Sequence, residues 1–444
     1  MSNKTAIQHN NVQRESLVID GALELNAQQQ DCYRLWCDGN SPYSCKLRTY
    51  MNYKAIPYKR MRINFETYFN IIPEKVGMSI MPVIITPSDE VMQDTTPIIQ
   101  EFEEKYSNNS CTPSDPRLAF IMWLLEDFGD EYLTRFSMHY RWGNNINRNT
   151  LSHRLGRSMS YGNVNMHANK VAPMILARQA GFDKPLGLSK AESRESLDEQ
   201  FIDLLSILDI HFSQYQFLLG DKPSVADFAL YGHLYAHMLQ DPFSAEIMET
   251  KGSRTCNWIE TIGELGDTRG FIGQTEFGDW INLDEAVPET LKQLLTFIAK
   301  TYIPFATGTA LATHENRKTF DVKVYDLDTS FMTFQYRAWS FENVQTHFAG
   351  LNDINKKFVN ELLVNTNIQP RMMENGILHC KLFDGFTPPY IKDGVADARI
   401  AHLKEKAKQK EKEKEKEKEK EKTKKEEKVL SHEANKKGVE DETV

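Results

Sequence analysis

The sequence predicts a small α/β domain, an all-helical domain after it, and a mostly helical extension that ends in a charged tail. Three observations lead to this prediction. Strand-like and helical stretches alternate within about 80 residues near the N-terminus, and the chain beyond them shows mainly helical periodicity. The length of 444 residues is too great for one ordinary core and indicates two or three domains.

The α/β unit opens with a strand, a turn and a helix. Residues 1–28 are rich in Asn, Gln and Ser without a clear period, so we expect a loose leader there. A first strand is predicted over Cys32–Cys37, and Asp38–Asn40 then gives a turn signal. A helix follows, because Ser41 suits an N-cap and Pro42 suits the first helical position.

Three more strands and a second helix complete this unit, which we place at residues 29–107. The strands are predicted over Tyr58–Ile63, Met81–Ile85 and Glu90–Met92. The helix begins at Asp94–Pro97. Its apolar face is made of Ile98, Ile99, Phe102 and Tyr106. The order βαβ, ββ, α is that of a compact α/β unit.

A polar linker, Ser107–Ser110, leads into a domain that is predicted to be all-helical over residues 108–270. Its first helix is expected over Leu118–Phe136. Another shows an apolar stripe of period 3.6, made of Leu197, Phe201, Leu204, Leu205, Leu208 and Phe212. Another helix starts at Ser224, and a further helix carries Trp258.

Residues 271–400 are predicted to form a mostly helical extension, with an amphipathic helix over 291–302 and a short hairpin over 320–334. No flexible linker precedes the extension, so we expect it to pack on the helical domain. Residues 401–444 form a Lys/Glu-rich tail. Alternation puts like charges at i,i+4 and opposite charges at i,i+3, so helix support largely cancels and a solvated, partly helical or disordered tail is expected.

The charge of the chain disfavours nucleic acid as its main partner. The net charge is -9, and the 15 lysines and 13 acidic residues from Ala401 onward leave the body at about -11. Phosphate contact needs a basic surface instead. The chain shows neither an apolar spanning run nor the apolar stretch of a signal peptide, so we expect a cytoplasmic protein without a membrane partner.

The cysteines indicate no metal site. The six are Cys32, Cys37, Cys45, Cys111, Cys256 and Cys380. They form neither a Cys-x-x-Cys pair nor a His/Cys cluster at metal spacing, so no metal is predicted. In a reducing cytosol most of them are expected to be buried free thiols.

Three short segments of the α/β unit resemble one known family. Ser41–Arg48 resembles the active-site turn of serine-type glutathione transferases, and also the Cys-Pro-Tyr-Cys turn of glutaredoxins with serine in place of both cysteines. Met81–Pro82 matches the cis-proline that starts the third strand of thioredoxin-like domains. Asp94–Thr95 resembles the Glu-Ser pair with which the family binds the γ-glutamyl group of glutathione.

A fourth segment, Phe217–Phe228, closely resembles the folding motif of the family's helical domain. There Ser224 caps a helix and Asp227 closes a capping box. Together the segments cover about residues 30–265 and resemble the soluble glutathione S-transferase superfamily. The resemblance implies an α/β thioredoxin-like N-terminal domain plus an all-α C-terminal domain, and by itself implies a homodimer.

The resemblance also implies a reaction, in which the thiol of glutathione, as co-substrate, is ionised and directed at a small electrophile. Ser41 is the catalytic residue. Met81 and Pro82 bind the cysteinyl part through the backbone. The carboxylate of Asp94 meets the γ-glutamyl ammonium, while Thr95 and the free N–H groups of the helix end hold its carboxylate.

The energetics permit this role for Ser41. A free thiol has a pKa of about 8.5, and lowering it by about two units requires roughly 2.7 kcal/mol. A hydroxyl that donates to the thiolate contributes about 1.5–3 kcal/mol. The helix N-terminus adds about 0.3–1 kcal/mol. The alternative is that Ser41 serves only as an N-cap.

Two other functions stay open. Disulfide exchange through Cys37, at the end of the first strand, or Cys45, one residue past the resolving position of a glutaredoxin, would make a glutathione-dependent thiol reductase or peroxidase. A non-catalytic interaction or scaffold protein of the same fold is favoured by the extension and the charged tail.

Several other residues have two interpretations each. Lys46 and Arg48 either add positive potential near the thiolate or form a solvated helix face. The electrophile pocket is expected between the domains, where Met122, Trp123 and Phe128 either line it or belong to the core.

Overall fold

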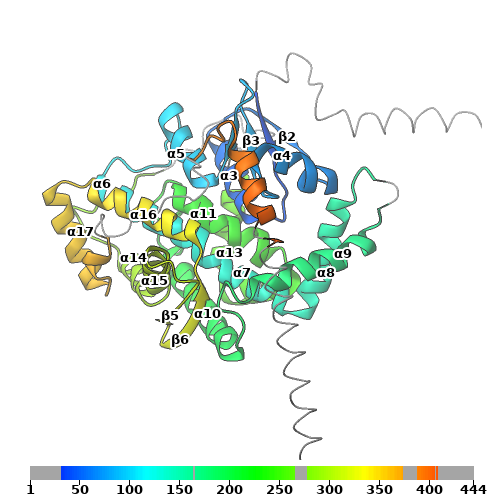
Figure 1. Cartoon of the computed structure of the whole chain (residues 1–444). Coiled ribbons are helices and arrows are strands. Elements are labelled where there is room, and N and C mark those ends of the chain that lie inside the picture. The colour runs from blue at the N-terminus through cyan, green and yellow to red at the C-terminus, as the bar shows by residue number, and fades with distance from the viewer. Residues whose placement is uncertain (1–31, 164–165, 266–277, 374–387, 406, 409–444) are drawn as a thin grey trace, which may run out of the picture.

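The computed structural model describes residues 32–163, 166–265, 278–373, 388–405 and 407–408, and Figure 1 shows their arrangement. The predicted leader and almost all of the Lys/Glu-rich tail lie outside the described residues, as does Cys380. None of the described helices is long and apolar enough to cross a membrane.

The N-terminal domain is built on a four-stranded sheet in the order β2-β1-β3-β4. The strands are β1 (Tyr33–Trp36), β2 (Tyr58–Met61), β3 (Val83–Ile85) and β4 (Val91–Gln93). Strands β1 and β2 are parallel, and β3 is antiparallel to both of its neighbours. The predicted thioredoxin-like domain is therefore confirmed.

Helices cover both faces of this sheet. They are α3 (Pro42–Tyr53), η1 (Thr67–Ile71), α4 (Ile72–Val76) and α5 (Thr95–Lys105). Successive strand residues point to opposite faces. Leu35 therefore joins the core that includes α3 and α5, while Trp36 joins a second core with α4. The sequence analysis did not predict η1 and α4.

The second domain is all-helical, as predicted. Its elements are α6 (Pro116–Asp127), η2 (Phe128–Tyr132), α7 (Leu133–Gly143), α8 (Asn145–Met159), α9 (Ala168–Gln179), η3 (Ala180–Phe182), α10 (Ala191–His211), α11 (Val225–His233), η4 (Leu234–Leu239), α12 (Pro242–Lys251) and α13 (Ser253–Glu264). The helix expected over Leu118–Phe136 is interrupted by the π-helical turn η2. Helix α11 lies in the middle and packs against α3 and α6.

Asp227 organises the start of α11. Its carboxylate accepts hydrogen bonds from the backbone of Ser224 (2.8 Å) and Leu218 (2.9 Å) and from the indole of Trp258 (3.1 Å). The residue is fully buried, so these donors offset the cost of removing the carboxylate from water. Asp227 thus joins the start of α11 to the loop at Leu218 and, through Trp258, to α13.

The extension packs on the helical domain. It contains α14 (Glu289–Lys300), α15 (Tyr302–His314), the hairpin β5 (Thr319–Val324) and β6 (Leu327–Met332), α16 (Gln335–Ala349), α17 (Asp353–Asn365) and η5 (Pro370–Met373). Helix α14 packs against α10, and α16 and α17 pack against α6. One continuous core therefore runs through the extension and both domains.

A late segment of the chain returns to the N-terminal sheet. Tyr390 pairs with Met92 of β4 in antiparallel fashion. The N–H of Gln93 donates to the carbonyl of Pro389 at 2.8 Å. Residues 395–405 are helical, and Arg399 donates to the side chain of Gln93 at 2.7 Å. The segment thereby covers the outer side of β4, which would otherwise be an open sheet edge.

Candidate functional site

Strand register brings the predicted site segments to one end of the sheet. Trp36, the last residue of β1, pairs with Val83, the first of β3, and Val83 pairs with Gln93, the last of β4. The loop that enters α3, the residue before β3 and the residue after β4 therefore share this end. These positions hold Ser41, Pro82 and Asp94.

Ser41 is the N-cap of α3 and lies half-buried at the mouth of the helix. The backbone N–H of Ser44 donates to its Oγ at 3.3 Å. In this bond the Ser41 oxygen is the acceptor, so its own hydroxyl hydrogen is available for a second bond. The capping role and the predicted donor role are therefore compatible.

Met81 and Pro82 precede β3 directly. The peptide bond between them is cis, as the resemblance implies. Pro82 is buried, and Met81 is half-buried against the core that includes Trp36.

Asp94 and Thr95 form the entrance to α5. Thr95 is buried as the first residue of the helix. Asp94 has a φ of 85°, a conformation that is strained for any residue but glycine. Burial raises the pKa of Asp94 to about 6, although a hydrogen bond from Tyr336 lowers it. Strain of this kind often marks a functional position.

Tyr336 is a site residue that the sequence analysis missed. It comes from α16 of the extension, and its hydroxyl donates to the carboxylate of Asp94. Burial raises its own pKa far above the usual range, so the hydroxyl stays protonated and remains a donor. No local sequence pattern marks it, because its partner lies in another domain.

Lys46 neither forms a solvated helix face nor adds potential near the thiolate, so both interpretations of its role are wrong. It is fully buried, and its ammonium pairs with Glu126 at 2.5 Å and with Asp130 at 2.6 Å. Burial lowers the pKa of Lys46, but the two carboxylates outweigh burial and raise it above its usual value. The lysine is therefore neither solvated nor free to act on a thiolate. It joins α3 to α6 and η2.

Two buried polar atoms at the domain interface, on Asp130 and Arg337, have no hydrogen-bond partner within the described part of the chain. Burial raises the pKa of Asp130 to about 7 despite the nearby Lys46. Arg337 of the extension pairs with Glu131 at 3.1 Å. Among the described residues, nothing hydrogen-bonds Oδ1 of Asp130 or Nη1 of Arg337. The domain interface thus holds more acidic than basic groups and keeps unused bonding capacity.

The expected electrophile pocket does not lie along the first long helix. Met122, Trp123 and Phe128 are all buried. The Trp123 ring stacks on His347 at a centroid distance of 4.9 Å, and Phe128 packs against Tyr302. The extension therefore covers these side chains, and they belong to the core.

Cys37 and Cys45 are poorly suited to thiol chemistry. Their exposed fractions are 1% and 0%. Burial raises the pKa of Cys37, and that of Cys45 to about 11. Both thiols are therefore protonated at neutral pH, whereas the thiolate is the nucleophile. Within the described ranges no group of three His, Cys, Asp or Glu residues is placed to hold a metal ion.

Comparison with solved structures gives distant similarities. The beta-etherase LigF from Sphingobium sp. strain SYK-6 is 19% identical, over 52% of this chain and 94% of its own, with a TM-score of 0.39. A glutathione S-transferase from Methylobacterium radiotolerans, in complex with glutathione sulfonate, is 16% identical over 56% and 99%, with a TM-score of 0.34. A glutathione transferase from Phanerochaete chrysosporium, in complex with oxidized glutathione, is 14% identical over 53% and 91%, with a TM-score of 0.30.

Family models give a clearer result. Residues 39–110 match the N-terminal domain of glutathione S-transferases, and residues 166–265 match their C-terminal domain. No curated protein matches the sequence. Both matches fall on the domains that the structure shows as thioredoxin-like and all-helical, so these two domains are similar to those of the soluble glutathione S-transferase superfamily.

Proposed function

We propose that this protein binds glutathione at the end of its N-terminal sheet and directs the thiol at a small electrophile. The observation that carries this proposal is the strand register. It puts the loop to Ser41, the residue before β3 and the residue after β4 at the same end of the sheet. A single tripeptide can span these three positions.

Each residue has a defined task in this proposal. The hydroxyl of Ser41 donates to the thiolate, and the N-terminus of α3 adds favourable potential. The backbone at Met81 and Pro82 pairs with the cysteinyl unit. The N–H groups that open α5, with Thr95, hold the γ-glutamyl carboxylate. Asp94 meets the ammonium, since a carboxylate has lone pairs left beyond its bond to Tyr336.

Three substitutions at Ser41 test the catalytic role apart from helix capping. Alanine removes both the hydroxyl and the cap, at about 1 kcal/mol of stability, whereas glycine caps almost as well as serine and lacks the hydroxyl. We expect Ser41→Ala and Ser41→Gly to lower kcat/KM for 1-chloro-2,4-dinitrobenzene by roughly 10- to 150-fold, which corresponds to about 1.5–3 kcal/mol. Ser41→Thr should keep most of the activity. Full activity in Ser41→Gly would show that Ser41 serves only as the N-cap of α3.

A scaffold without catalysis is the second candidate. The observation that favours it is the bond from Tyr336 to Asp94, because the extension then occupies the group expected to bind glutathione. Retention of the parent on immobilised glutathione separates the two candidates. Absence of retention supports the scaffold, and retention with activity that Ser41→Ala lowers supports the transferase. The thiol reductase is disfavoured by the burial of both cysteines.

The remaining proposals rest on the resemblance and the composition. We propose a homodimer in the cytoplasm, with domains bounded at residues 29–107 and 108–270 and an extension over 271–400. Light scattering of the purified full chain measures the oligomeric state directly, and a monomer at micromolar concentration would contradict the homodimer.

A further inference from the structure

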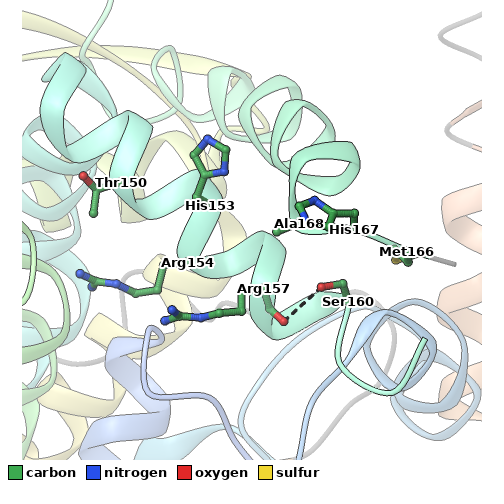
Figure 2. A pocket seen from close by; sticks show the side chains of 8 residues that line it. All are labelled: Thr150, His153, Arg154, Arg157, Ser160, Met166, His167 and Ala168. Carbon is green, nitrogen blue, oxygen red and sulfur yellow. Dashed lines mark hydrogen bonds between the residues drawn. The ribbon is translucent and has the colours of Figure 1, made fainter. Parts of the chain in front are cut away.

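A cavity of about 630 Å³ lies between α8 and α9 (Figure 2). Four of its lining residues belong to α8: Thr150, His153, Arg154 and Arg157. Their spacing of i, i+3, i+4 and i+7 puts them on one face of the helix. The rest of the lining lies around the turn into α9: Ser160, Met166, His167 and Ala168. The volume falls within the range of about 300–1,000 Å³ that small-molecule sites occupy.

The lining combines polar donors with a small apolar surface. The hydroxyl of Thr150 and the rings of His153 and His167 can each donate a hydrogen bond. Met166 and Ala168 are half-buried and offer apolar atoms. The cavity therefore suits a ligand with a polar head and a short apolar body.

The helical hairpin that holds the cavity is basic, although the whole chain has a net charge of -9. No Asp or Glu occurs between Glu131 and Asp183, whereas seven Lys and Arg residues do. Helices α8 and α9 lie within this stretch. An acidic partner for their arginines must therefore come from another element.

Two carboxylates from other elements reach α8, and both have other partners. Asp241, the N-cap of α12, accepts hydrogen bonds from Arg141 at 2.6 and 3.1 Å, and Arg154 contacts it at 3.4 Å. Asp38 accepts a hydrogen bond from the hydroxyl of Ser158 at 3.0 Å, and Ser158 does not line the cavity. The positive charge at the cavity is therefore only partly balanced.

Arg157 keeps its full bonding capacity for a ligand. It is exposed, and it forms no ion pair within the described ranges of the chain. Figure 2 shows Arg154 and Arg157 extending in the same direction from α8. Two guanidinium groups beside further donors exceed what one carboxylate requires, whereas a phosphate monoester offers three terminal oxygens and a charge of about -1.5 to -2.

We propose that this cavity binds a small phosphate monoester. The phosphate pairs with Arg157 and Arg154, and the apolar body of the ester lies against Met166 and Ala168. The proposal is independent of the proposed function, because none of these residues takes part in binding or activating glutathione there. Binding can therefore be measured without glutathione.

Calorimetry of the full chain with four compounds tests the ligand class. We expect 2-naphthyl phosphate to bind about tenfold more tightly than 2-naphthoate and roughly 100-fold more tightly than neutral 2-naphthol, because charge-assisted hydrogen bonds are added at each step. Inorganic phosphate should bind about tenfold more weakly than the ester, because it lacks the apolar body. Equal affinity for the ester and the naphthoate overturns the preference for phosphate. Equal affinity for the ester and inorganic phosphate overturns the monoester.

Two glutamine variants of exposed arginines on α8 locate the binding site. Arg157→Gln should lower the affinity for 2-naphthyl phosphate about tenfold and leave that for 2-naphthol unchanged. Arg148→Gln is the matched control, because nine residues at about 100° each place it on the opposite face of α8. It should leave both affinities unchanged. An equal loss in the two variants, or unchanged binding in Arg157→Gln, overturns the site at the cavity.

Discussion

Tyr336 of the extension donates a hydrogen bond to Asp94 in the proposed glutathione site. Removing this hydroxyl should therefore shift the pH dependence of glutathione binding in a defined direction. Asp94, with its pKa at about 6, must be ionised to meet an ammonium, so glutathione affinity should fall as the pH drops through this value. The groups that face Asp94 are Lys46 from α3, Glu126 from α6, Glu131 from η2 and Tyr336 from α16. In Tyr336→Phe a bond that lowers the pKa of Asp94 is lost, so the midpoint should move to higher pH.

Calorimetric titration with glutathione between pH 5 and 8 measures this midpoint. Tyr325→Phe is the control, because Tyr325 also belongs to the extension and donates to a carboxylate, that of Asp203. Identical midpoints in the parent and Tyr336→Phe would show that Tyr336 does not tune the site. The stability of the fold should depend on pH in the opposite direction from glutathione affinity. The Asp94 pKa lies above its usual 3.8, so stability that is present below that pH is lost as the pH rises through about 6.

At the scale of elements, the buried pair of Lys46 with Glu126 and Asp130 fixes α3 on the helical domain. Lys46→Met leaves two buried carboxylates without their cation. We expect this variant to lose about 3–5 kcal/mol of unfolding free energy at pH 7.5. The loss should be smaller at pH 5, because Asp130, whose pKa burial raises to about 7, then takes up a proton.

Urea unfolding at the two pH values checks the expectation for Lys46→Met. Lys75→Met on α4 removes an exposed lysine and should change stability by less than about 0.5 kcal/mol. An equal loss at pH 5 and pH 7.5 would mean that lost packing of the lysine stem, rather than unpaired charge, accounts for the destabilisation.

The sequence predicts well those helices and strands that short local patterns specify. Ser41 and Pro42 mark the start of α3, and the strands fall within a few residues of their expected bounds. The pairing of Lys46 was unpredictable, because its partners lie about 80 residues away on a helix that reads as apolar. The bond from Tyr336 to Asp94 was unpredictable as well, because the two residues lie far apart in the sequence. Local sequence indicates which segments form the site, but not which distant side chains complete it.

At the scale of the whole molecule, buried polar contacts connect all three parts of the chain. Lys46 joins the thioredoxin-like domain to the helical domain, and Arg337 joins the extension to Glu131. Asp127 of α6 accepts hydrogen bonds from Tyr302 and Ser340 of the extension. A local opening of any part would leave such groups unpaired, so we expect the described domains and the extension to unfold together.

Asp127 offers the sharpest test of this coupling. Burial raises its pKa well above the usual range, and asparagine keeps the size of the side chain and one acceptor oxygen. Asp127→Ala leaves both hydroxyls unpaired, at about 2–4 kcal/mol. Hydrogen exchange in rising urea should then show α14–α16 opening before β1–β3. In the parent and in Asp127→Asn both regions should open at the same urea concentration. Earlier opening of the extension in the parent would show that it folds as a separate unit, and that Tyr336 reaches Asp94 only while the extension is docked.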